Sequence, residues 1–195
     1  MDGKLKILLH ACCAPCVTVP VKRLSEKFIT DVLFYNPNIS PREEYGLREQ
    51  EIIELGRRWK FPVRSGPYDH ENWKKLVHGM ENEPERGKRC QICIRMRLKQ
   101  TAVLAKAGEY SLFTTTLTLS PLKDAAMIHR IGLEIAEQTG IGFLASDFKK
   151  QDGFRQSIEY GRLENLYRQD YCGCQYSRRK GRENPARTRR SGKIS

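Results

Sequence analysis

Short apolar runs alternate with longer amphipathic stretches along this chain. The apolar runs predict β-strands over residues 6–10, 31–35, 61–65, 111–117 and 142–145. The stretches between them predict helices over residues 15–27, 40–59, 71–78, 90–106, 124–138 and 154–165. Because strands and helices alternate, we expect an α/β fold with a mainly parallel sheet and helices on its faces.

The helix over residues 40–59 has the clearest start signal. Ser40 stands before Pro41, Glu43 and Glu44, and acidic residues and proline are favoured in the first turn of a helix. We therefore expect Ser40 to cap this helix, which should run to Trp59.

Composition sets the broad class of protein. The 195 residues are 39% hydrophobic and 30% charged, a profile typical of a globular chain and not of a disordered one. No apolar run approaches the roughly 20 residues that a membrane helix needs. The first residues predict a β-strand and not a signal peptide. We therefore expect a cytoplasmic protein without a membrane partner, folded as a single domain over residues 1–177.

Positive charge is concentrated at the end of the chain. The formal net charge is +12, and residues 178–195 hold eight Lys/Arg and one Glu, about +7 of that total. Such a basic tail is either a solvated, mobile segment or an arm that follows a phosphate backbone. The remaining charge of about +5 favours a polyanionic partner.

Seven cysteines are the most informative feature of the sequence. They are Cys12, Cys13, Cys16, Cys90, Cys93, Cys172 and Cys174. A reducing compartment and a core of adequate size argue against a disulfide framework. A structural zinc needs only four ligands and leaves three cysteines unexplained.

The spacing of the cysteines favours a metal centre. Cys90 and Cys93 lie one helical turn apart, so both can bind one centre. The group that begins at Cys12 closes the first strand, at the sheet edge where open α/β sheets bind ligands, and Pro15 begins the next helix. Four thiolates suit a [4Fe–4S] cluster, and the other three could hold a second metal ion, iron or zinc. The partition between the two centres stays open.

Six ordered motifs resemble the cobalamin-independent epoxyqueuosine reductase family. They are LLHACCAPC at 8–16, FYNPNI at 34–39, RCQIC at 89–93, FTTTL with a following SP at 113–121, SDFKK at 146–150 and YRQDYCGC at 167–174. The resemblance spans about residues 5–177. It implies a Rossmann-like, adenine-nucleotide-hydrolase-like sheet that carries an iron–sulfur cluster.

The resemblance also implies a reaction. An epoxide on the wobble nucleoside of tRNA would be reduced to the alkene, which turns epoxyqueuosine into queuosine and releases water. This takes two electrons and two protons, so an electron donor such as a ferredoxin or flavodoxin is expected. The Ser-Gly-Gly-x-Asp-Ser phosphate loop of ATP-using relatives is absent after the first strand, and cysteines stand there instead.

Several other residues are candidates for the chemistry. Asp69, Asp147 and Asp152 could bind the second metal or donate a proton, although a loop Asp more often closes a turn or caps a helix. His10 precedes the cysteines, where it either hydrogen-bonds to a metal ligand or serves as a structural histidine. We expect His129 to be structural or exposed.

Basic and aromatic side chains are candidates for RNA contacts. The candidates for phosphate are Lys149, Lys150, Arg155, Arg168 and the basic tail. Tyr35, Tyr68 and Tyr171 could stack on a splayed base, and Asn36 could approach it. Threonines 114–116 either form an ordinary strand or line the pocket. Two rival functions remain, a zinc-stabilised RNA-binding module and a tRNA-thiolating relative.

Overall fold

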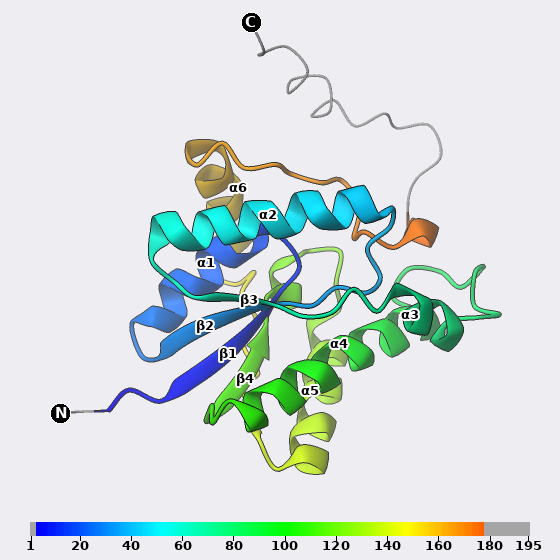
Figure 1. Cartoon of the computed structure of the whole chain (residues 1–195), viewed down its shortest axis with the longest axis horizontal. Coiled ribbons are helices and arrows are strands. Elements are labelled where there is room, and N and C mark those ends of the chain that lie inside the picture. Colours follow the sequence, from blue (N-terminus) through cyan, green and yellow to red (C-terminus); the bar gives the residue numbers. More distant parts are fainter. Residues whose placement is uncertain (1–2, 178–195) are drawn as a thin grey trace, which may run out of the picture.

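A five-stranded parallel sheet is the centre of the molecule. The computed structural model describes residues 3–177 (Figure 1). The strands are β1 Lys6–Ala11, β2 Ile29–Phe34, β3 Val63–Ser65, β4 Leu112–Thr115 and β5 Gly142–Phe143, in the order β3-β2-β1-β4-β5. This architecture confirms the α/β fold with a parallel sheet that the alternating pattern predicted.

Helices cover both faces of the sheet. Helices α1 (Ala14–Ser25), α2 (Arg42–Trp59) and α6 (Gly153–Leu163) lie on one side, and α4 (Lys88–Ala107) and α5 (Ala125–Thr139) lie on the other (Figure 1). The short α3 (His70–Leu76) packs beside α4. The result is a three-layer α/β/α arrangement, which buries both faces of a parallel sheet as its hydrophobic strands require.

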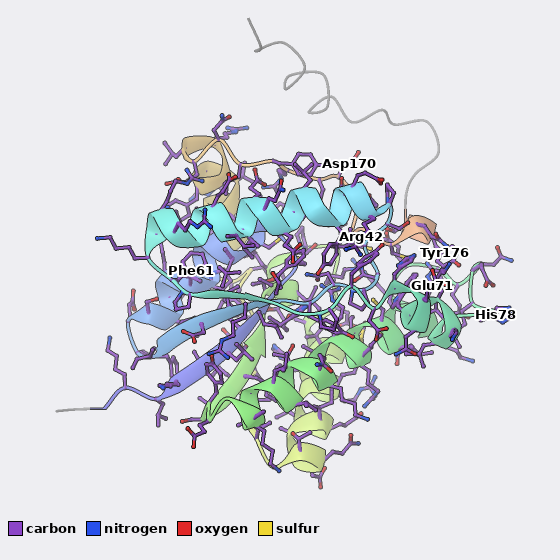
Figure 2. All side chains as sticks on the ribbon, viewed as in Figure 1. Arg42, Phe61, Glu71, His78, Asp170 and Tyr176 are labelled. Atoms are coloured by element: carbon purple, nitrogen blue, oxygen red, sulfur yellow. A yellow bond between two sulfur atoms is a disulfide. The ribbon has the colours of Figure 1, made fainter. Side chains whose placement is uncertain are left out.

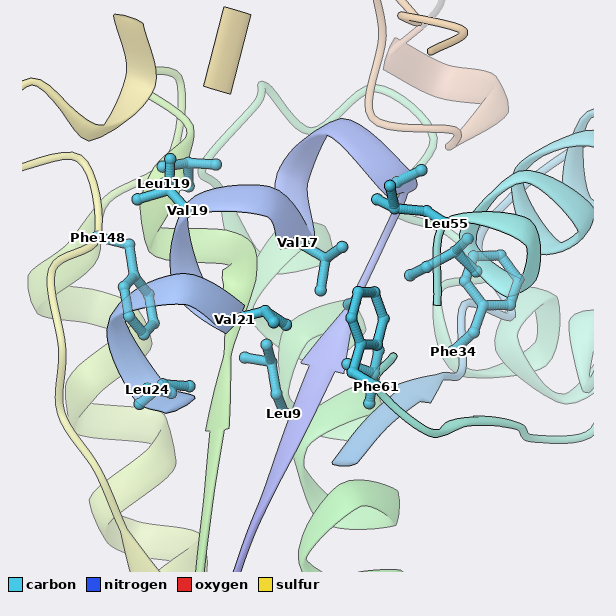
Figure 3. Close-up of a cluster of buried hydrophobic side chains, with 14 of the residues drawn as sticks. Leu9, Val17, Val19, Val21, Leu24, Phe34, Leu55, Phe61, Leu119 and Phe148 are labelled. Atoms are coloured by element: carbon cyan, nitrogen blue, oxygen red, sulfur yellow. The ribbon is translucent and has the colours of Figure 1, made fainter. Parts of the chain in front are cut away.

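The central strand β1 joins two hydrophobic cores. Ile7 and Leu9 pack with α1 and α2 in one core, which Figure 3 shows around Leu9, and Leu8 packs with α4 and α5 in the other. Successive strand residues point to opposite faces, and all three side chains are buried. This explains why β1 reads as a continuous apolar run.

Several boundaries differ from the sequence expectations. Pro41, not Ser40, occupies the N-cap of α2, and the Ser40 N–H instead donates to the Gly173 carbonyl oxygen at 2.9 Å. The strand expected over 111–117 ends at Thr115, because the chain turns there into the 3₁₀ helix η1 (Thr116–Leu119). A second 3₁₀ helix, η2 (Gln175–Ser177), ends the described part of the chain.

Two further expectations concern the basic C-terminal tail and the absence of a membrane helix. The basic tail over residues 178–195 lies outside the described residues. Among the residues that the structure describes, no helix combines the length and the apolar character needed to cross a bilayer.

Candidate metal centre

The first cysteine group lies where the sheet topology changes direction. From β1 the chain crosses to β2 on one side, whereas β4 pairs with β1 on the other side. Ligands of open α/β sheets bind at the carboxyl ends of such strands. Cys12 directly follows β1, and its Sγ lies 3.8 Å from Oγ1 of Thr116, which directly follows β4.

Cys12, Cys13 and Cys16 form a compact sulfur triplet. Their three sulfur atoms lie within 4.8 Å of one another, close enough to bind one metal ion. In this structure Cys13 and Cys16 are joined as a disulfide, with Cα atoms 5.4 Å apart, whereas the sequence argument expected no disulfide. Cys13 is the N-cap residue of α1 and Cys16 lies in its first turn, and this spacing places the two Cα atoms within disulfide range. Thiolates are the metal ligands, so this pair binds metal only when it is reduced.

The other four cysteines come from two distant segments. Cys90 and Cys93 lie in the first turns of α4, where the helix dipole favours thiolates. Cys172 and Cys174 follow α6, and two hydrogen bonds bring them to the loop after β2. Asn38 Nδ2 donates to the Cys172 carbonyl oxygen at 3.3 Å, and the Ser40 N–H donates to the carbonyl oxygen of the intervening glycine.

The glycine between Cys172 and Cys174 is needed for this placement. Gly173 has a φ of +99°, and a Cβ there would lie 2.6 Å from the Ile39 side chain. We expect Gly173→Ala to lower the free energy of unfolding by about 1–3 kcal/mol and to weaken metal retention, because both cysteines must shift. Urea unfolding and iron content measure the two effects.

A matched control is available in α2. A Cβ at Gly46 would meet no atom within 4 Å, and alanine is the better helix former, by up to about 1 kcal/mol. We expect Gly46→Ala to leave metal retention unchanged and the protein equally or more stable. Equal losses in the two variants would contradict the role given to Gly173.

One small cavity is lined by four cysteines, by the cations Arg89, Arg97 and Lys123, and by the carboxylate of Glu85. The cysteines of this inner cavity are Cys90, Cys93, Cys172 and Cys174. A larger outer cavity of about 330 Å³ opens beside it and is lined by Cys12 and Cys16 of the triplet. Cys172, Arg97 and Lys123 line both cavities. The two cysteine groups therefore face one continuous site.

The thiols of the inner cavity differ in acidity. A hydrogen bond from Cys174 holds the pKa of Cys172 well below its ordinary value, against the effect of burial and with help from Lys123. The pKa of Cys174 is raised by the same hydrogen bond and by burial. Burial lowers the pKa of Lys123. The charge interactions with Cys172, Cys90 and Cys93 raise it, and the net direction is upward. Within this pair, the hydrogen bond and Lys123 thus favour negative charge at Cys172 over Cys174.

A buried network holds Arg97 under the site. Arg97 is 3% exposed. Its Nε donates to His10 Nε2 at 3.3 Å, and its Nη2 donates to Asn36 Oδ1. The His10 Nε2 atom also lies 3.2 Å from the Tyr35 carbonyl oxygen, and its Nδ1 atom lies 2.8 Å from Thr115 Oγ1. Burial, and then the charge of Arg97, lower the pKa of His10 well below its usual value. The ring is therefore neutral and able to accept.

The charges of Arg97 and Lys123 fit an anionic metal centre. Neither Arg97 nor Lys123 forms an ion pair with a carboxylate among the described residues. A buried cation without a partner costs several kcal/mol. Both side chains face the four cysteines of the inner cavity, whose thiolates bound to metal supply the missing negative charge. The residues present therefore fit a metal–thiolate centre.

The other candidate residues are spread over several places. His10 lies beneath the cavities and contacts Arg97. Asp69 is the N-cap residue of α3 and accepts from Asn72 Nδ2 at 3.1 Å. Asp147 lies 3.6 Å from Lys149 Nζ. Asp152 precedes α6 and pairs with Arg155. The three aspartates do not line either cavity, so their catalytic roles stay predictions.

His129 packs edge-on against Phe143, as a structural residue does.

Some of the residues proposed for RNA contacts line the outer cavity, and others line neither cavity. Arg168 and Tyr171 line the outer cavity, whereas Lys149, Lys150, Arg155, Tyr35 and Tyr68 line neither cavity. Asn36 is fully buried and donates to the Ala11 carbonyl oxygen at 2.9 Å. Of the threonine run, Thr114 bonds to the Leu144 carbonyl oxygen, Thr115 holds His10, and Thr116 lines the outer cavity.

Sequence reasoning missed several residues of the inner cavity, among them Trp73, Arg97 and Lys123. Arg97 had a signal, because it follows Cys93 by four positions and shares its helix face. Lys123 and Trp73 come from a loop and a short helix, and no spacing rule connects them to a cysteine motif.

Fold and site together define a class, the α/β proteins with a Rossmann-like sheet order and a thiol centre suited to metal at the strand ends. Residues 7–180 match the model of the family described as "Epoxyqueuosine reductase QueH". The chain belongs to this family.

Relatives of this family resemble the chain over most of its length. The epoxyqueuosine reductase QueH of Histophilus somni is 38% identical over 91% of this chain and 74% of its own length. The protein of the same name from Haemophilus influenzae is also 38% identical, over 91% of this chain and 74% of its own length. The Thermotoga maritima protein is 33% identical over 92% of this chain and 94% of its own length.

Solved structures confirm the fold class. The U34-tRNA thiolase NcsA from Methanococcus maripaludis, solved with its [4Fe-4S] cluster, has a TM-score of 0.56 at 10% identity and covers 91% of this chain and 63% of its own. A predicted subunit of tRNA methyltransferase from Methanocaldococcus jannaschii has a TM-score of 0.51 at 10% identity over 82% and 88% of the two chains. At this identity the likeness concerns the fold alone.

Proposed function

We propose that the protein reduces epoxyqueuosine to queuosine at the wobble position of tRNA. The observation that carries this proposal is the gathering of seven cysteines at one sheet edge, beside a cavity of about 330 Å³ and with the cations Arg97 and Lys123 among them. A cavity of this size lies in the range of small-ligand sites. Membership of the epoxyqueuosine reductase family supports the same substrate.

We assign the two cysteine groups by counting ligands. Cys90, Cys93, Cys172 and Cys174 would hold a [4Fe–4S] cluster, which takes one external ligand per iron. The triplet of Cys12, Cys13 and Cys16 has three sulfurs and borders the outer cavity, so it would hold a second metal, iron or zinc, with a position open toward substrate. Together these groups would supply single electrons and a Lewis acid for the epoxide oxygen.

The chain's own residues would bind and orient the nucleoside. Arg168 lies at the outer cavity with its guanidinium 5.1 Å from the Phe154 ring centre, a position from which it can contact a phosphate. Tyr171 lines the same cavity, with its hydroxyl donating to the Ser40 carbonyl oxygen at 3.0 Å and the Arg48 guanidinium 5.2 Å from its ring centre, and its ring would border the bound base. Arg97 and Lys123 would hold positive charge beside the centre while electrons arrive.

The overall reaction balances with two electrons and two protons. The epoxide loses both C–O bonds, the two carbons become an alkene, and the oxygen leaves as water. The electrons would come from a reduced ferredoxin or flavodoxin, delivered one at a time. Asp69 and Asp147 remain our proposed catalytic residues, and His10 would support catalysis as a positioning residue through Arg97. We place the reaction in the cytoplasm, with tRNA as the partner.

Anaerobic reconstitution tests this function directly. The iron-loaded protein is incubated with epoxyqueuosine-containing tRNA and a chemical reductant, and digested nucleosides are separated by mass. We expect epoxyqueuosine to disappear as queuosine forms, and a brown protein that absorbs near 400 nm. A colourless zinc protein that leaves the epoxide intact would contradict the proposal and favour an RNA-binding module.

A further inference from the structure

A tryptophan closes the inner cavity on the side of α3. Trp73 has no solvent exposure and packs with Cys93 and Cys174 in one small hydrophobic cluster. It also lines the inner cavity together with all four cysteines proposed to hold the cluster. The indole is therefore in place to contact whatever those cysteines bind.

The indole N–H of Trp73 has no acceptor of its own. Its Nε1 atom is buried, and no oxygen or nitrogen of the described residues accepts a hydrogen bond from it. Buried donors are nearly always paired, and leaving one unpaired costs about 1–3 kcal/mol. Trp73 packs with the side chains of Cys93 and Cys174, so a sulfur held by these cysteines is the acceptor that the geometry offers.

The orientation of the indole is fixed by its neighbours. The ring centres of Trp73 and His70 lie 5.5 Å apart with 20° between their planes, and those of Trp73 and Tyr176 lie 6.1 Å apart with 29° between theirs. His70 Nδ1 lies 2.7 Å from the Pro37 carbonyl oxygen, and the Arg89 guanidinium lies 5.1 Å from the Tyr176 ring centre. Figure 2 labels Tyr176 close to α3. Both stacking partners are thus themselves anchored.

We infer that Trp73 is a positioning residue whose indole N–H donates a hydrogen bond to a sulfur of the centre held by Cys90, Cys93, Cys172 and Cys174. The inference rests on the proposed function. A donated N–H withdraws electron density from the sulfur and stabilises the more negative, reduced state of an iron–sulfur centre. Trp73 therefore raises the reduction potential and makes the centre easier to reduce.

The test compares two tryptophan variants of the reconstituted protein. Trp73→Phe keeps an aromatic ring and removes the N–H. Trp59→Phe is the matched control, because the only other indole N–H of the chain donates to Glu164 Oε1 at 2.9 Å in another part of the molecule. Redox titration followed by electron paramagnetic resonance gives the midpoint potential of each.

We expect Trp73→Phe to make one-electron reduction about tenfold less favourable, a shift of about 59 mV to more negative potential. Trp59→Phe should match the parent protein. A Trp73→Phe protein that keeps its cluster and its parental potential would overturn the inference. A merely structural role for Trp73 would change cluster content or stability and leave the potential of the loaded fraction unchanged.

A spectroscopic measurement covers the case in which Trp73→Phe fails to fold. In the Trp59→Phe background, Trp73 is the remaining tryptophan, and it can be labelled with ¹⁵N at the indole. We expect a hyperfine coupling between this nitrogen and the reduced cluster. A parent protein that binds no cluster contradicts the proposed function, whereas a bound cluster without this coupling contradicts only the role of Trp73.

Discussion

Cys93→Ser should abolish the iron–sulfur chromophore and lower epoxyqueuosine reduction by more than about 100-fold. Loss of a residue that only hydrogen-bonds to a metal ligand costs up to about 100-fold, and loss of a ligand itself should cost more. Cys93 is 8% exposed in α4, so water cannot readily take the place of the lost sulfur. A serine hydroxyl is a harder and much less acidic ligand than a thiol. Absorption near 400 nm, iron content and nucleoside analysis measure the effect.

The matching variant in the triplet distinguishes the two proposed centres. Cys12 lies beside Thr116 at the end of β1, and we assign it to the second metal. Cys12→Ser should therefore keep the cluster chromophore, lose the additional metal and lose activity. If Cys12→Ser instead bleaches the protein while Cys93→Ser remains brown, the ligand assignment is reversed.

Arg97→Met should lower activity at least tenfold and shift the reduction potential of the centre to a more negative value. The guanidinium is buried beside the thiols of the inner cavity and forms no ion pair with a carboxylate among the described residues. Its charge therefore acts on the anionic centre with little screening, because the protein interior has a low effective dielectric constant. Methionine has a similar length and no charge.

Two measurements separate this charge effect from a loss of packing. His10 and Asn36 each lose a donor in Arg97→Met, so the metal-free protein should lose about 1–3 kcal/mol of unfolding free energy. Arg97→Lys retains the charge without the same hydrogen bonds. It should lose similar stability but stay nearer the parental potential. Equal potentials in the methionine and lysine variants would refute the electrostatic role.

Much of the architecture could be predicted from local patterns. The alternation of apolar runs and amphipathic stretches identified the five strands and the six α-helices of the described residues, because side-chain period reflects burial within one element. The local patterns did not predict that β4 ends at Thr115. They also did not predict that the Ser40 N–H donates to the Gly173 carbonyl oxygen. Both depend on contacts with segments far away in the sequence, which no local period records.

The amino-acid sequence alone determined that this protein is an α/β protein with seven cysteines placed for metal, and its motifs indicated the family. The tertiary structure decided which cysteines meet. Hydrogen bonds from Asn38 and Ser40 bring the segment around Gly173 to the loop after β2, more than 130 positions away. It also placed Arg97 and Trp73 against the thiols. A buried charge or donor acquires its role from the groups packed around it, and that packing exists only once the chain has folded.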